Sequence, residues 1–410
     1  MNSRSVSSTV DLPSQHPAWS AVGAMTLCVA LLIASEFMPV SLLTPMARDL
    51  HATEGMAGQA ISVSGLFAVV TSLLIASAAG RVDRRHVLIG LTATMLASLV
   101  LIALAPSFPL LMAARALLGI TIGGFWSLST ATLIRLVPAE SVPRAMGILY
   151  MGNAVATAFA APLGSWLGGV IGWRGVFWLL VPFTVATLVW QWRSLPSMPA
   201  TAAVPVGRVL ALLNRRHVAF ALLGVMLTFG GAFATFTYLR PFLEQYTQVT
   251  AAQLPLLLLG LGVAGFVGTR GATLLMQRHL DKLLVGLPLA LALVTLAMLA
   301  GGHAVWAVGL AMIAWGTLNA AVPVAWFNWL AQSVRDEPEA GGGLMVAAIQ
   351  LAIMLGAGFG GLLLDHVSIA ATFLGGAALL LLGGLAVGSG QRLQARPSRR
   401  TPSFLQEQST

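Results

Sequence analysis

Apolar runs of the length needed to cross a lipid bilayer recur along almost the whole chain. The hydrocarbon core takes a helix of about 20 residues, and twelve runs approach or exceed that length: 19–45, 56–79, 87–105, 109–134, 143–171, 175–192, 217–239, 252–276, 283–300, 304–331, 340–366 and 369–388. Only 9% of the 410 residues are charged, against about 25% in average soluble domains. Because backbone groups in lipid must be satisfied within the segment, the runs predict helices. The fold class is therefore all-α integral membrane, with twelve transmembrane helices, and a soluble enzyme is excluded.

One polar stretch divides these spans into two sets of six. Residues 193–216 contain several Pro, Gly and small residues and predict a linker, with a short surface helix over Val206–Leu213. An N-terminal six-helix bundle over 19–192 and a C-terminal one over 217–390 follow, with tails at 1–18 and 391–410. The first run exceeds the roughly 7–15 apolar residues of a signal peptide, which predicts a retained helix.

Basic residues predict the orientation. With the N-terminus inside, the outer loops hold only Arg48, Arg174 and Arg240, and most of the 22 Lys and Arg lie in the inner loops, linker and tails. Basic residues accumulate on the cytoplasmic side, so both termini are expected in the cytoplasm. The net charge of +9 therefore indicates topology, and no nucleic acid is expected as a partner.

The two halves resemble each other at an offset of 197 residues. The offset places Glu140 on Glu337, Asn153 on Gln350, and two glycines on glycines, Gly119 on Gly316 and Gly164 on Gly361. Several matches at one offset predict two pseudo-symmetric repeats, the architecture of an alternating-access transporter.

Four motifs are similar to those of the major facilitator superfamily, in its drug/proton antiporter branch. They are Gly80–Arg85, Arg115–Gly124, Ala161–Gly169 and Gly172–Phe177. Residues Glu36–Leu50 resemble the arabinose-efflux-like permeases, and Trp19–Leu385 resembles the bacterial purine ribonucleoside efflux permeases. The resemblance implies a monomeric antiporter that exports nucleosides such as inosine and guanosine against an inward flow of protons. Export of sugars or drugs by a related permease is the alternative, and a channel is the next class.

No cofactor, metal or ATP is expected. Cys28 is the single cysteine, the seven histidines form no ligand pair, and the chain has no phosphate-binding loop or clustered catalytic set. The protein is therefore not expected to be an enzyme.

Glu36 is the one acidic residue deep inside a span. An ionised group there costs about 3 kcal/mol on insertion scales, so a site that exchanges a proton is expected. Arg115, in the fourth span, is the expected ion-pair partner, and the resemblance also assigns this arginine to proton coupling. The competing interpretation is a permanent salt bridge that packs two helices.

Substrate contacts are expected from neutral polar and aromatic residues inside the spans, because a nucleoside is uncharged. Each could equally serve as an interhelical hydrogen bond or a packing residue. The candidates are Trp126, Asn153, Thr235, Tyr238, Asn319, Trp326 and Gln350.

A further set is expected to act in conformational change. The resemblance implies that Asp83, Arg84 and Arg85 form a cytoplasmic latch that stabilises the outward-open state, and the competing interpretation is a topology signal. Gly119 and Gly123 permit close helix contact, and Pro162 and Gly164 are expected to shape the fifth span.

Overall fold

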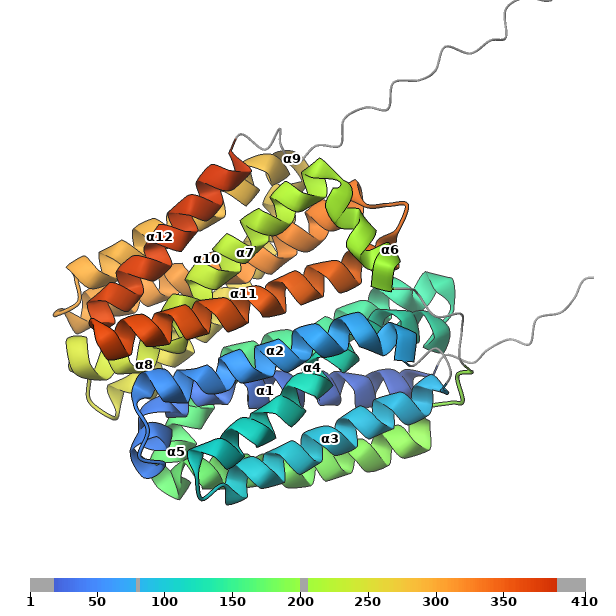
Figure 1. The fold of residues 1–410 in the computed structure, drawn as a ribbon, viewed down its shortest axis with the longest axis horizontal. Helices are drawn as coiled ribbons and strands as arrows, with labels where there is room; N and C mark the ends of the chain where they lie inside the picture. The colour runs from blue at the N-terminus through green and yellow to red at the C-terminus, as the bar shows by residue number, and fades with distance from the viewer. Residues whose placement is uncertain (1–17, 79–81, 200–205, 389–410) are drawn as a thin grey trace, which may run out of the picture.

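The computed structural model describes residues 18–78, 82–199 and 206–388, and the regular structure in these ranges is helical (Figure 1). Eleven helical segments are long and apolar enough to cross a membrane. One of them, Arg144–Ser194, has 51 residues and holds two spans, which meet at Gly172 with a φ of 73°. The twelve-helix fold is confirmed.

Among the described residues of the first half are five helices and a short 3-10 turn. They are α1 Trp19–Asp49, α2 Glu54–Ala78, α3 Arg84–Leu104, α4 Phe108–Leu136, η2 Ala139–Ser141 and α5 Val142–Ser194. The side chain of Asp83 caps α3 by accepting a hydrogen bond from the backbone N–H of Arg85 at 2.8 Å. The ends of these helices differ from the ends of the predicted apolar runs by only a few residues, because the length of an apolar run sets the length of the helix that crosses the membrane.

The second half repeats the arrangement after a short linker helix, α6 Val206–Ala211, with a 3-10 turn η3 Leu212–Asn214. The expected linker helix is therefore present. The elements that follow are α7 Arg216–Thr237, α8 Leu239–Pro241, a π-helical turn η4 Phe242–Tyr246, α9 Gln253–Ala300, α10 Val305–Ser333, α11 Pro338–His366 and α12 Ile369–Val387. A non-helical backbone at His279 divides α9 into two spans.

The internal repeat is visible in the helix contacts. A Cβ added at Gly119 would lie 2.2 Å from the Ser64 carbonyl oxygen, and one added at Gly316 would lie 2.1 Å from that of Leu261. Both the glycines and their partners are separated by the predicted 197 residues. Glycine is required at both positions, because α4 touches α2 and α10 touches α9 backbone to backbone.

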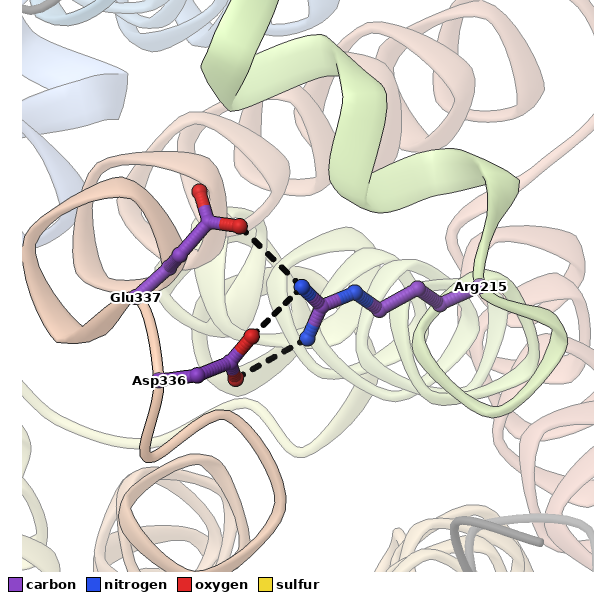
Figure 2. A network of polar contacts seen from close by, with 3 residues as sticks. All are labelled: Arg215, Asp336 and Glu337. Atoms are coloured by element: carbon purple, nitrogen blue, oxygen red, sulfur yellow. Dashed lines mark hydrogen bonds and ion pairs between the residues drawn. The ribbon is translucent and has the colours of Figure 1, made fainter. Parts of the chain in front are cut away.

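The molecule has two distinct ends, named here the linker end and the far end. Ala18, just before α1, donates its N–H to the Leu136 carbonyl at the end of α4, so both lie at the linker end. Figure 1 shows α6 at this end and α8 at the opposite one. At the linker end Arg215 binds Asp336 and Glu337, with N–O distances of 2.6 and 3.1 Å, which fixes the start of α7 to the start of α11 (Figure 2).

Candidate functional site

Glu36 lies in the middle of the molecule, where the two bundles meet. It is 5% exposed and stands two residues beyond the centre of α1, about 3 Å along the axis. The side chain of Gln350, on α11 of the other bundle, lies near its carboxylate and interacts with it. Gln350 is itself only 6% exposed. Two of the residues expected in the site therefore form a polar contact between the bundles.

Arg115 is fully buried on α4 and reaches across to α1 and α2. Its Nη1 donates to the Ser35 carbonyl at 2.9 Å and its Nε to the Ala60 carbonyl at 3.1 Å. Its Nη2 is buried and finds no hydrogen-bond partner in the described ranges. The charge of Arg115 acts on Glu36, whose neighbour Ser35 it binds. However, none of the ion pairs between described residues joins the two, so the expected direct contact is not formed in this conformation.

Trp126 and Asn153 lie together on the linker half of the first bundle. The Trp126 ring stacks on the Tyr150 ring of α5, with centroids 5.9 Å apart and planes inclined by 28°. Asn153 follows Tyr150 by one helical turn and is half-buried. Trp126 thus contacts α5 through Tyr150, one helical turn before Asn153.

The expected residues of the second bundle have mixed environments. Trp326 is 1% exposed and packs edge-to-face on Trp329, with Gly224 against its ring, as a core residue does. Thr235 is buried and donates to the Gly231 carbonyl of its own helix at 3.2 Å. Asn319 stands at the centre of α10, half-buried, and no hydrogen bond of its side chain is found within the described ranges. Of these three residues, Asn319 is the one whose side-chain amide has no hydrogen-bond partner among the described residues.

Tyr238 lies at the far end, in the seam between α2 and α11. It is fully buried and donates its hydroxyl to the Ala357 carbonyl at 2.7 Å, with Gly55 of the first bundle 3.4 Å away. A Cβ added at Gly58 would lie 2.1 Å from the tyrosine oxygen. Tyr238 therefore holds the two bundles in contact at the far end.

Asp365 completes the seal by capping α2 from the other bundle. One carboxylate oxygen accepts the Thr53 hydroxyl at 2.6 Å, and the other accepts the Gly55 backbone N–H at 3.0 Å. Thr53 in turn accepts the N–H of Met56 at 3.0 Å. The free N–H groups at the start of a helix are a favourable site for an anion, so separating the bundles at the far end would uncap α2.

The predicted latch residues lie against the end of α5 in this conformation. Asp83 accepts hydrogen bonds from Ser197 and from the Met198 N–H, and Arg85 donates to the Trp192 carbonyl. The backbone N–H of Arg84 donates to the Met198 carbonyl. Burial by itself raises the pKa of the Asp83 carboxyl, but its hydrogen bonds together hold that pKa below its ordinary value. Gly80 and Arg81 of the same motif lie outside the described residues.

The small residues of α4 and α5 mark close helix contacts. A Cβ at Gly123 would lie 2.1 Å from the Ala68 carbonyl oxygen of α2, and one at Gly164 would lie 2.6 Å from the Ser41 hydroxyl of α1. Pro162 lies inside α5, two residues before Gly164. These contacts assign the glycines to helix packing.

Comparison with known proteins decides the family. Residues 25–344 match the sequence model of the Major Facilitator Superfamily. The chain belongs to this superfamily. Its members are transporters, which supports a membrane transporter of small molecules rather than an enzyme.

Two relatives match nearly the full chain. The Pseudomonas aeruginosa protein named "Transcription regulatory protein OpdE" is 49% identical over 388 residues, which covers 93% of this chain and 96% of that protein. The purine ribonucleoside efflux pump NepI of Salmonella typhimurium is 40% identical over 378 residues, covering 92% and 95%. The resemblance to such pumps is confirmed, although the two names differ.

Solved structures share the fold at low sequence identity. A D-xylose–proton symporter superposes with a TM-score of 0.72 at 16% identity, covering 90% of this chain and 97% of that one. A bacterial homologue of the human lysosomal transporter Spinster, in an inward-facing and unoccupied conformation, superposes with a TM-score of 0.69 at 16% identity, covering 93% and 99%.

Sequence reasoning missed Tyr150 and Asp365. Tyr150 is one of only three tyrosines in the chain, which is the one signal that sets it apart. Asp365 ends a span with no motif around it, and its role follows only from the contact between distant helices.

Proposed function

We propose that this protein is a proton-coupled antiporter that exports purine ribonucleosides by alternating access. The observation that carries the proposal is the contact between Glu36 and Gln350. A carboxyl group that can gain or lose a charge lies where one bundle must separate from the other. Protonation there changes a contact between the bundles and couples the charge to the motion.

Arg115 supports this coupling. A buried guanidinium N–H without a partner costs about 1–3 kcal/mol, and Nη2 is such a group among the described residues. In a second state the ionised Glu36 carboxylate, or a substrate oxygen, would satisfy it. Proton release from Glu36 thereby favours the state in which the carboxylate moves toward Arg115.

The nucleoside assignment rests on the 40% identity to the purine ribonucleoside efflux pump. The polar groups around the centre are compatible with it, since Asn153, Asn319 and Gln350 are neutral amides that suit base edges and ribose hydroxyls. The name of the Pseudomonas aeruginosa relative, a transcription regulatory protein, indicates no substrate.

The proposed orientation places both termini and the linker end in the cytoplasm of a bacterial inner membrane. Its support is the distribution of basic residues, because Arg135, Arg144, Arg193, Arg215 and Arg216 all lie at the linker end. The far end then faces the periplasm, and protons that move inward supply about 2.3 kcal/mol per 100 mV.

Inverted vesicles with an imposed proton gradient test the function. The wild type should accumulate inosine, and Glu36→Gln should bind inosine but not concentrate it. Glu337→Gln, a carboxylate held by Arg215 at the linker end, is the matched control and should still accumulate it. Continued uphill transport by Glu36→Gln would contradict the proton site, whereas uptake of arabinose or a cationic dye without inosine would contradict the cargo.

A further inference from the structure

We propose that Tyr150 binds the planar ring of the cargo, with its ring as the stacking surface and Asn153 as the group that contacts the ring's edge. This inference rests on the proposed function, because it assumes a cargo with a flat heteroaromatic ring. It assigns the base, as opposed to the ribose, to the wall formed by α4 and α5. The argument depends on the direction in which these side chains face.

The direction of Trp126 follows from its helix. Trp126 lies eleven residues after Arg115, which is about 20° around α4 and about 17 Å along it toward the linker end. Arg115 points at the carbonyls of α1 and α2, and Gly119 touches α2. This face of α4 is therefore turned toward the inside of the protein, and Trp126 lies on it.

Tyr150 shares that inner space. Its ring stacks on the inward-facing Trp126, yet it remains 40% exposed. On α5, Gly152 packs on Thr26 of α1, and Ala158 lies against Gly262 of α9 in the second bundle. Tyr150 is about 160° from Gly152 and only about 80° from Ala158 around the helix. Its exposed surface is therefore turned toward the gap between the bundles, on the linker half.

Polar groups accompany this aromatic surface. Tyr150, Asn153 and Thr157 follow at spacings of three and four, so they share one face of α5. Thr157 donates its hydroxyl to the Asn153 backbone carbonyl at 2.8 Å, while no hydrogen bond is found for the Asn153 amide or the Tyr150 hydroxyl within the described ranges. A phenol and a carboxamide offer donors and acceptors at the edge of a stacked ring.

At the positions that correspond through the repeat, the opposite bundle has no aromatic pair. At the offset of 197 residues, Trp126 corresponds to Pro323 and Tyr150 to Ala347, while Asn153 corresponds to Gln350, which binds Glu36. The repeat therefore keeps an amide on both walls and an aromatic pair on one. The stacked rings of the second bundle, Phe236 and Trp315, stand at other positions of the repeat, and Glu36 lies beyond Tyr150 toward the far end.

Initial rates of inosine uptake into inverted vesicles test the assignment. Tyr150→Leu should raise the half-saturating concentration of inosine at least about tenfold, as expected for loss of one stacking contact, with the maximal rate within twofold of wild type. Tyr150→Phe keeps the aromatic ring and should raise the half-saturating concentration of inosine less than Tyr150→Leu does. Trp166→Leu, at an exposed aromatic of the same helix, is the control and should leave it unchanged.

A second measurement separates binding from folding. Inosine should raise the melting temperature of the purified wild type and of Trp166→Leu but not of Tyr150→Leu, whose melting temperature without ligand should match wild type. An unchanged half-saturating concentration in Tyr150→Leu, or an undiminished thermal shift, would overturn the proposal. If the wild type takes up a planar cationic dye and no inosine, the proposed function fails. The variants are then compared with the dye, and an unchanged half-saturating concentration of the dye in Tyr150→Leu would overturn the stacking role of Tyr150.

Discussion

Removal of the Asp365 carboxylate should open the far end of the molecule. In the structure this group accepts the Thr53 hydroxyl at 2.6 Å and the Gly55 N–H at 3.0 Å, and both donors belong to the other bundle. Loss of a helix N-cap costs about 0.5–2 kcal/mol, typically about 1. The cap exists only while the bundles are together, so its whole contribution separates the two states. Asp365→Ala should then raise the equilibrium ratio of open to closed far end about fivefold, and Asp365→Asn, which keeps an acceptor oxygen, should raise it less.

Cysteine labelling measures this shift. Ser62 on α2 donates to the Met354 carbonyl of α11 at 2.9 Å, so Ser62→Cys reports when these helices separate. The single native cysteine, Cys28, is fully buried and contributes little background. In detergent, the labelling rate of Ser62→Cys should rise about fivefold with Asp365→Ala and stay constant with Asp336→Ala, which breaks an ion pair within one bundle. An unchanged or slower rate in Asp365→Ala would refute the capping argument.

Two further predictions concern the same balance of states. Gly58→Ala places a methyl group 2.1 Å from the Tyr238 hydroxyl, so this change should accelerate the labelling of Ser62→Cys. Adding Tyr238→Ala should cancel the effect of Gly58→Ala, because the clashing side chain is then gone. If the effects of the two changes on the labelling rate were additive, the cause would not be steric. The hydrogen bond from Arg215 lowers the pKa of Asp336, so this pair stabilises the protein above the ordinary pKa of about 3.9 and loses that effect as the pH falls below it. The difference in melting temperature between wild type and Asp336→Asn should therefore be constant from pH 7 to pH 5 and disappear below about pH 4. A difference that disappears near pH 6 would contradict this assignment.

The membrane-spanning helices could be predicted from the sequence because the length of an apolar run sets the length of its helix. The run at 109–134 became Phe108–Leu136, and the run at 304–331 became Val305–Ser333. Glu36 could be singled out because a carboxylate in lipid is rare. Its contact with Gln350 could not, since 314 positions separate the two residues and only the packing of the two bundles, in which α11 lies on α2, brings them near each other.

Aromatic residues were the hardest to assign. Trp126 and Trp326 look alike in the sequence, each inside an apolar run, and hydrophobicity alone gives no direction around the helix. The structure distinguishes them by their neighbours, an exposed tyrosine for Trp126 and a second buried tryptophan for Trp326. The burial of such a ring depends on which helix packs against it, and the sequence around the tryptophan does not determine that helix.

The connections at the far end limit how this side of the protein can move. Only residues 50–53 join α1 to α2, and only residues 367–368 join α11 to α12. Neither of these two connections is long enough to fold over an opening as a lid, so each pair of helices has to tilt together. Because Thr53 and Asp365 stand beside the two connections, parting them displaces four helices in one step. The far end should accordingly behave as an all-or-none switch, with no partly open state long-lived enough to leak protons.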